Sequence, residues 1–232
     1  MAVKKIWFSF IAFLLAFLTC FVYINGATVY NAASIINTNK KKIIIDAGHG
    51  GFDGGASVGD ILEKDINLVI AKNLKCLISM FGYDIIMVRE SDCAINTEGN
   101  SIRTKKISDM KNRLQIMKNY PEAEFISIHL NKYSTSEPCG LQVFYSPNNE
   151  KSLILSNNIQ ETVRMVLQKE NHRKVKKATK DTYLLYNAPI PAVIIECGFL
   201  SNPQELENLT NSEYQQKLAF ACFCGIITNN SL

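Results

Sequence analysis

The chain has 232 residues, of which 47% are hydrophobic, and its formal net charge is +4. This length can fill one α/β domain and a short appendage, but it is too short for two well-filled cores. A nucleic-acid-binding surface would normally be far more basic, so the composition excludes nucleic acid as a partner.

The first part of the chain has the pattern of a signal peptide or membrane anchor over residues 1–24. Lys4 and Lys5 precede nineteen uncharged, mostly apolar residues, Ile6–Ile24. A helix of that length is ~28 Å long, close to the ~30 Å hydrocarbon core of a bilayer. The lysines favour export of the remainder across the cytoplasmic membrane. Because Asn stands three residues before each candidate cleavage site, an uncleaved anchor is favoured, followed by a polar linker over residues 25–41.

The rest of the chain, residues 42–232, alternates short β-branched runs with helix-period stretches. Strands are predicted at Ile43–Asp46, Asp84–Arg89, Phe125–His129, Leu141–Tyr145 and Val193–Glu196. Helices are predicted at about Leu62–Phe81, Lys151–Lys169 and Ser212–Asn229. This order predicts a single α/β domain whose twisted, mostly parallel sheet has helices on both faces.

The seven cysteines form no CxxC pair and no even framework in the exported part. Most lie in apolar stretches, where free cysteine behaves as a small buried hydrophobe. We therefore expect no disulfide scaffold, and strand alternation assigns Cys197 to packing. His172 lies in a basic cluster and is expected at the surface.

Polar side chains end or follow three of the predicted strands. His49 lies in the turn G-H-G-G after the first strand, His129 ends F-I-S-I-H, and Glu196 ends V-I-I-E. Because the carboxyl ends of parallel strands meet at one edge of a sheet, these side chains are expected to converge there. With Glu63, fourteen residues after His49, the two histidines have the composition of a catalytic zinc site. Glu196 is then left as the general acid and base.

Two of these residues have ordinary structural interpretations. His49 also fits the pattern of an ordinary histidine that is hydrogen-bonded within a turn. Glu63 stands three residues after Asp60, which is the spacing of a capping box, so it could merely begin the helix. Residue types and spacing leave these alternatives open.

Four ordered motifs carry a family resemblance. They are G-H-G-G-F-D-G-G-A (48–56), L-E-K-D-I-N-L (62–68), S-I-H-L-N (127–131) and P-A-V-I-I-E-C-G-F-L-S-N-P (191–203). From about Lys42 to Thr228 the chain resembles the zinc-dependent N-acetylmuramoyl-L-alanine amidases of the Amidase_3 type. The resemblance implies Zn²⁺ on His49, Glu63 and His129, with Glu196 as the catalytic acid and base.

The resemblance also implies substrate contacts. Asn131 belongs to the second histidine motif, and Arg113 resembles the helix arginine that precedes that motif. Arg89 in V-R-E-S-D resembles the usual T-R-x-x-D, with Val88 in place of Thr. The segment Arg173–Lys176 has a Lys where many relatives have the Gly of an R-G-V-K motif. The detailed substrate contacts of those relatives are therefore not carried over to this chain.

The implied activity is hydrolysis of the amide between N-acetylmuramic acid and L-alanine in peptidoglycan. The sequence of residues 183–203 resembles the sporulation branch of the family, which removes stem peptides from spore cortex so that muramic-δ-lactam can form. Alternatives are a vegetative cell-separation amidase, a zinc carboxypeptidase acting on stem peptides, and a non-enzymatic wall-binding module. The short stretch between His129 and Glu196 leaves no room for an inhibitory helix, so an exported activator or regulatory partner is expected.

Overall fold

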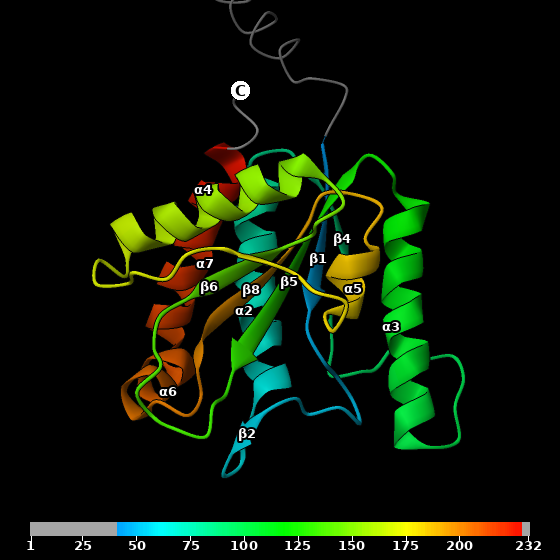
Figure 1. Cartoon of the computed structure of the whole chain (residues 1–232), viewed down its shortest axis with the longest axis horizontal. Coiled ribbons are helices and arrows are strands. Elements are labelled where there is room, and N and C mark those ends of the chain that lie inside the picture. Colours follow the sequence, from blue (N-terminus) through cyan, green and yellow to red (C-terminus); the bar gives the residue numbers. More distant parts are fainter. Residues whose placement is uncertain (1–40, 229–232) are drawn as a thin grey trace, which may run out of the picture. The chain divides into compact units, whose positions relative to one another are not determined.

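The computed structural model describes residues 41–228, which fold around a six-stranded sheet (Figure 1). The strand order is β4 (Asp84–Met87), β1 (Lys42–Ala47), β5 (Ala123–Asn131), β8 (Ala192–Phe199), β6 (Gln142–Tyr145) and β7 (Lys176–Lys177). The first four are parallel, β6 is antiparallel to β8, and β7 is parallel to β6. The predicted mostly parallel sheet is confirmed.

Helices cover both faces of this sheet. One face carries α2 (Glu63–Met80), α4 (Glu150–Val166) and α7 (Ser212–Thr228), and the other carries α3 (Ile102–Asn119) and α5 (Tyr183–Asn187). The short helix α6 (Pro203–Thr210) contacts β8 and α7. The three predicted helices are confirmed, each with its ends within three residues of the prediction.

The core has two halves because side chains alternate along each strand. On β1, Ile43 and Ile45 pack in the half covered by α2, α4 and α7, whereas Ile44 packs in the half covered by α3 and α5. All three have no exposed surface, as expected for a parallel strand buried on both faces. Cys197 is fully buried in the first half, in agreement with its assignment to packing.

Helix α3, the short helices α5 and α6 and the two-residue strands were not predicted. Few α3 side chains are buried, namely Asp109, Arg113, Leu114 and Met117, so the helix has no apolar stripe to read from the sequence. Its start does carry a local signal, since Ser101 and Thr104 bond each other's backbone N–H in a capping box. The strands β2 (Ser57–Val58) and β3 (Ile61–Leu62) form a small separate hairpin.

The predictions for residues 1–24, and for the linker up to residue 40, lie outside the described residues. Between residues 41 and 228 no helix is both long and apolar enough to cross a bilayer. The six cysteines in this part are free thiols, and His172 is exposed as expected.

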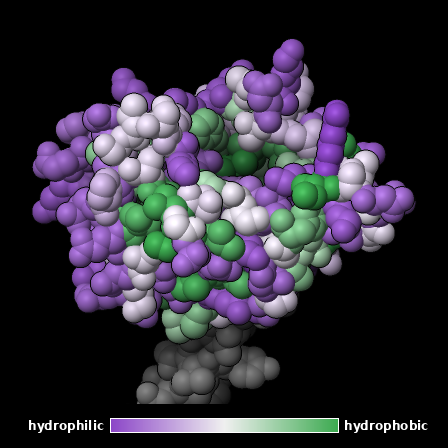
Figure 2. Space-filling view, turned by 90° about the horizontal axis from the view of Figure 1, so that it is seen from below, coloured by the Kyte–Doolittle hydropathy of each residue, from purple (hydrophilic) through white to green (hydrophobic). Residues whose placement is uncertain are grey.

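The carboxyl edge of the sheet is the part of the fold that matters for function. Strands β1, β5 and β8 are adjacent and parallel, so they end side by side at this edge. Helix α2 begins there, because the hairpin β2–β3 leads directly into Glu63. Figure 2 views the protein from below Figure 1, from the end toward which β5 points, and shows a mainly hydrophilic surface with scattered hydrophobic groups.

Candidate active site

His49 reaches the carboxyl edge through an unusual turn after β1. Its φ of 62° is the one positive value at a non-glycine residue between positions 41 and 228. Left-handed backbone is costly for a residue with a Cβ, so neighbouring contacts must hold it. Gly50 and Asp53 do so by exchanging backbone hydrogen bonds of 2.9 and 3.1 Å. The imidazole then contacts Asp53 Oδ2 through Nδ1 at 2.9 Å and Glu63 Oε2 through Nε2 at 3.2 Å.

Glu63 is the first residue of α2 and does not cap the helix. Leu62 is the N-cap residue and makes no side-chain cap hydrogen bond, so the capping-box interpretation is wrong. The Glu63 carboxylate instead accepts hydrogen bonds from the backbone N–H groups of Ala56 at 2.8 Å and Leu130 at 3.0 Å. It is 3% exposed. Burial alone raises the pKa of Glu63, but bonds to His129 and His49 outweigh it and hold the pKa well below its usual range.

His129 completes the cluster from β5. Its Nδ1 lies 3.1 Å from Glu63 Oε1, and its ring meets that of His49 edge-on at 5.0 Å. Two glycines make this approach possible. A Cβ at position 48 would lie 2.3 Å from the His129 ring, and one at position 55 would lie 2.5 Å from Glu63 Oε2. The glycines of the first motif therefore leave space for the ligands.

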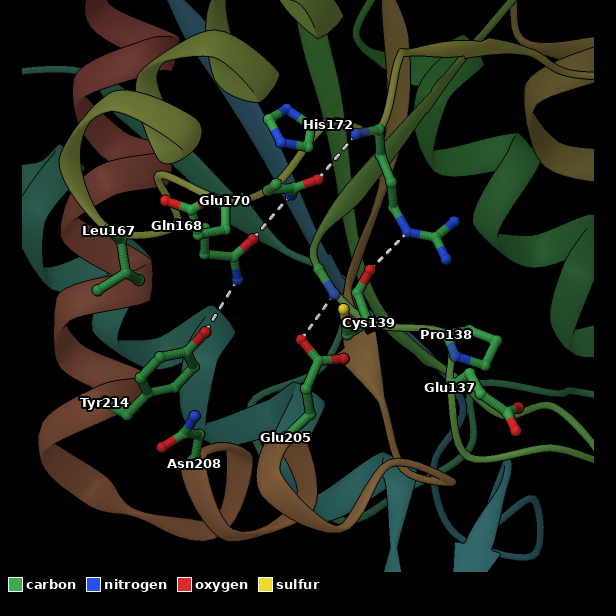
Figure 3. A pocket seen from close by; sticks show the side chains of 13 residues that line it. Glu137, Pro138, Cys139, Leu167, Gln168, Glu170, His172, Glu205, Asn208 and Tyr214 are labelled. Carbon is green, nitrogen blue, oxygen red and sulfur yellow. Dashed lines mark hydrogen bonds between the residues drawn. The ribbon is translucent and has the colours of Figure 1, made fainter.

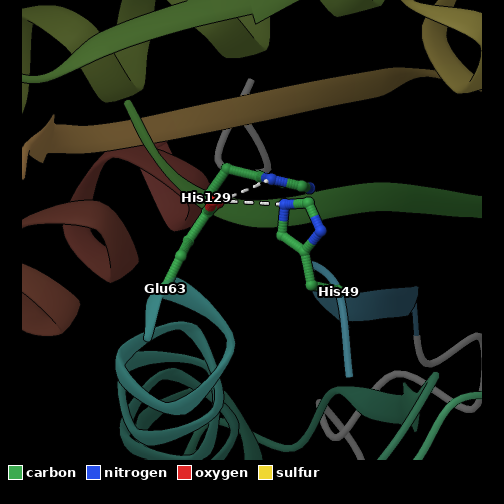
Figure 4. A group of neighbouring side chains, drawn as sticks. All are labelled: His49, Glu63 and His129. Atoms are coloured by element: carbon green, nitrogen blue, oxygen red, sulfur yellow. Dashed lines mark hydrogen bonds and ion pairs between the residues drawn. The ribbon is translucent and has the colours of Figure 1, made fainter. Parts of the chain in front are cut away.

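The three side chains fit a metal ion (Figure 4). One ligand atom from each of His49, Glu63 and His129 lies within 4.8 Å of the others, and this is the one such group in the described part of the chain. The cluster also favours positive charge. Burial alone lowers the pKa of His49, yet bonds to Asp53 and Glu63 raise it to about 9. Two neutral imidazoles and one carboxylate are a common ligand set for catalytic zinc.

Glu196 lies beside this cluster as predicted. It is paired in register with His129 across β5 and β8. Its Oε2 is buried and makes no hydrogen bond to any described residue. Burial raises the pKa of Glu196, and the charge of Glu63 adds to this effect, while His129 and His49 oppose it. A carboxylate oxygen that is buried without a partner is costly, and the position of Glu196 next to the cluster suits a proton carrier.

Arg113 was expected to contact substrate, but the structure places it beneath the turn. It is 2% exposed, pairs with Asp46 and Asp109, and donates to the carbonyl of His49 at 2.8 Å. Asp46 also accepts from Ser127 Oγ at 2.6 Å. Arg113 therefore joins α3, β1 and β5 and supports the His49 backbone, in place of the expected contact.

The same correction applies to Arg89, which is 3% exposed. Its guanidinium donates to four backbone carbonyls, those of Ala47 at 2.8 Å, Gly48 at 3.0 Å, Lys64 at 2.8 Å and Ser91 at 3.1 Å. It thereby ties the turn after β1 to the start of α2. Asn131 differs, because it is half-buried at the end of β5, where its Oδ1 accepts from Lys132 N at 2.8 Å. Its contact with substrate stays a prediction.

Sequence reasoning assigned no role to three polar residues of this region: Asp46, Asp53 and Ser127. Each has a readable position, since Asp46 ends a β-branched run, Ser127 shares a strand face with His129, and Asp53 follows His49 within the glycine-rich turn. Their partners come from other segments, which local spacing cannot reveal.

A cavity of about 520 Å³ lies beyond β6, between the segment 137–140, the end of α4 and the helices α6 and α7 (Figure 3). Arg173 lines this cavity and also contacts β6, where its Nη1 donates to Gln142 Oε1 at 3.1 Å. Gln142 is the register partner of Glu196 on β6. The Arg173 guanidinium also lies over the Phe199 ring, 4.5 Å from its centre.

At its carboxyl edge this α/β sheet carries two histidines and a carboxylate that can hold a metal ion, with a separate half-buried glutamate beside them. This is the arrangement of a metal-dependent hydrolase. Comparison with known proteins gives the family. Residues 43–228 match the Amidase_3 model, described as N-acetylmuramoyl-L-alanine amidase. The chain belongs to this family and is an N-acetylmuramoyl-L-alanine amidase.

Three relatives are similar to this chain over most of its length. The chain is 38% identical over 189 residues to the germination-specific N-acetylmuramoyl-L-alanine amidase of Bacillus subtilis, covering 81% of this chain and 78% of that protein. It is 43% identical to the CwlD amidase of Clostridioides difficile, solved in complex with the GerS lipoprotein, with a TM-score of 0.79 over 83% of this chain and 99% of that one. Another amidase, from Clostridium difficile 630, is 27% identical with a TM-score of 0.72 over 84% of this chain and 98% of that one. The chain is thus a CwlD-like amidase.

Proposed function

We propose that the enzyme is a zinc-dependent hydrolase that removes stem peptides from the muramic acid of spore-cortex peptidoglycan, so that muramic-δ-lactam can form. The observation that carries the zinc requirement is the cluster of His49, Glu63 and His129, whose ligand atoms lie within 4.8 Å of one another. Zinc, when bound, lowers the pKa of water toward ~7 and polarises the scissile carbonyl.

The residues of the chain would hold the metal ion and transfer the protons. His49, Glu63 and His129 hold the ion, with Nε2 of His49 turned toward Glu63 because Asp53 accepts at Nδ1. Glu196 takes a proton from the attacking water and delivers a proton to the alanine nitrogen as the carbon–nitrogen bond breaks. The pKa of Glu196 is raised by burial, which helps the carboxyl group to keep the proton that it takes from water until the alanine nitrogen accepts it.

The cortex role is supported by the relatives. The Bacillus subtilis protein is named as germination-specific, and its likeness covers most of both chains. Vegetative cell separation is the alternative within the family. Deleting the gene in its host tests the choice. Loss of muramic-δ-lactam from spores with normal cell division is expected, whereas chains of unseparated cells with unchanged cortex would exclude the cortex role.

We further propose an exported lipoprotein partner. The Clostridioides difficile relative was solved with one, and that relative matches this chain over 99% of its length. Export is supported by Lys4, Lys5 and the apolar run Ile6–Ile24, which we propose to be a signal peptide or membrane anchor. Fractionation of host cells tests this. Enzyme found in the cytoplasmic fraction would contradict export, and release from membranes by salt alone would contradict an anchor.

The zinc proposal is tested by metal analysis of the purified enzyme. About one zinc ion per chain is expected, with activity lost on chelation and restored by zinc. Full activity after complete removal of metal would exclude the mechanism.

A further inference from the structure

Helix α3 holds the His49 turn at two separate points. Arg113 makes the buried contact, from Nη2 to the carbonyl oxygen of His49 at 2.8 Å. Almost two turns nearer the start of the helix, Lys106 Nζ lies 2.8 Å from Asp53 Oδ1. The Lys106 side chain is 49% exposed, while that of Asp53 is 20% exposed. The second contact therefore reaches from the helix surface toward the imidazole of His49.

Asp53 is held on both of its carboxylate oxygens. Oδ2 contacts His49 Nδ1 at 2.9 Å, and Oδ1 contacts Lys106 and also accepts from the backbone N–H of Gly55 at 3.3 Å. Of the two bonds to Oδ1, the lysine contact is shorter and charge-assisted. A carboxylate fixed at one oxygen only could rotate about its bond to Cβ. With both oxygens held, Asp53 has one orientation toward His49.

We propose that Lys106 is a positioning residue for the metal centre, which acts by fixing Asp53 and through it the ring of His49. This inference rests on the proposed zinc site. The turn needs such support because the backbone of His49 has a φ of 62°, a costly conformation that neighbouring contacts must hold. The result is that Nε2 stays directed toward Glu63, 3.2 Å away.

The size of the effect follows from distance and exposure. Removing a group bonded directly to a metal-binding histidine typically weakens metal affinity about 10-fold to 100-fold. Lys106 is one contact further out and half exposed, so solvent and salt weaken its interaction. Replacing Lys106 by Met is therefore expected to weaken zinc affinity by about 3-fold to 10-fold, which is less than the loss of a directly bonded group.

The experiment uses the full chain and zinc alone, with the dissociation constant measured by competition against a chromophoric chelator at fixed pH and salt. Lys106→Met is compared with Lys106→Arg, which keeps the charge, and with Lys111→Met, an exposed lysine further along α3. Weaker binding in Lys106→Met, near-normal binding in the other two and equal unfolding temperatures without metal are expected.

A double-mutant cycle separates positioning from a general effect of charge. Asp53→Asn keeps an amide oxygen for His49 Nδ1 but removes the charge that Lys106 contacts. In that background Lys106→Met should have no further effect on zinc affinity. An equal effect in both backgrounds, or no effect on the wild-type chain, would overturn the inference while leaving the zinc site intact. A wild-type chain that binds no zinc would remove the proposed zinc function and this inference together.

Discussion

His129 and Glu196 occupy paired positions on β5 and β8, two neighbouring parallel strands that end at the same edge of the sheet. Adjacent strands are about 4.8 Å apart, so this pairing places the proposed proton carrier beside a proposed metal ligand. The separation depends on the sheet register and not on a flexible loop. A shift of β8 by one residue would turn Glu196 into the opposite half of the core and bring Cys197 to the site.

Glu196→Gln should abolish most activity without loss of metal. The amide has nearly the same shape but cannot accept and return a proton, so we expect kcat to fall at least ~100-fold, the usual scale for a general acid and base. Zinc content and unfolding temperature should be unchanged. The exposed Glu170→Gln is the control. Near-wild-type turnover by Glu196→Gln would refute its assigned role.

Gly48→Ala should weaken metal binding because the new Cβ would lie 2.3 Å from the His129 ring. The ring must move, and we expect zinc affinity to fall by at least ~10-fold, as when support of a ligand is lost. Gly54→Ala is a matched control, since its Cβ would meet only Leu62, at 3.6 Å. Chelator competition measures both variants. Equal affinities would show that the site can shift to accept the methyl group.

The stability of the metal-free enzyme should depend on pH through His49. Its pKa is raised from 6.5 to about 9 in the folded protein, so its favourable contacts are fully present below pH 6.5 and are lost as pH rises to about 9. Glu63 acts oppositely, because its pKa is lowered from 4.5 and its contribution is lost as pH falls below that value. Metal-free enzyme should therefore be most stable between about pH 4.5 and 6.5.

Thermal unfolding from pH 4 to 9 tests this dependence. The unfolding temperature of metal-free enzyme should fall between pH 6.5 and 9, and His49→Gln should remove most of that fall. Zinc-loaded enzyme should not show it, because zinc binds the neutral imidazole. If the unfolding temperature of the metal-free enzyme rose between pH 6.5 and 9, this prediction would be wrong.

Arg113→Met should destabilise the fold strongly. The change leaves the carboxylates of Asp46 and Asp109 buried without their cation, which typically costs about 3–5 kcal/mol. Denaturant unfolding measures the loss. Arg103→Met changes an exposed arginine of the same helix and should alter the free energy of unfolding by less than about 0.5 kcal/mol. Similar values for the two variants would contradict the buried role of Arg113.

The sequence predicted the elements that carry strong periodicity or β-branched runs. The isoleucines of β1 and the apolar stripe of α2 are examples, because burial of such side chains fixes both the type of element and its inner face. Helix α3 escaped prediction because it packs few apolar side chains and is held largely by Arg113 and its buried partners. Ion pairs between distant segments leave no periodic signal.

The site was predictable for a different reason. His49, His129 and Glu196 each end or follow a strand, and parallel strands bring such residues together. The arginines were not predictable in this way. Their match to family motifs suggested that Arg89 and Arg113 contact substrate, whereas three-dimensional packing assigns them to the carbonyls and carboxylates behind the His49 turn. Burial of a charged group depends on its partners, which only the fold reveals.

The most direct test of the central claim is mass spectrometry of peptidoglycan digested by the purified enzyme, with zinc and after chelation. Hydrolysis of the muramoyl amide predicts intact stem peptides with a free L-alanine amino group, glycan strands whose lactyl carboxyl groups are free, and neither product without metal. Stem peptides still attached to glycan but shortened at their carboxyl ends would identify a carboxypeptidase and contradict the assigned reaction.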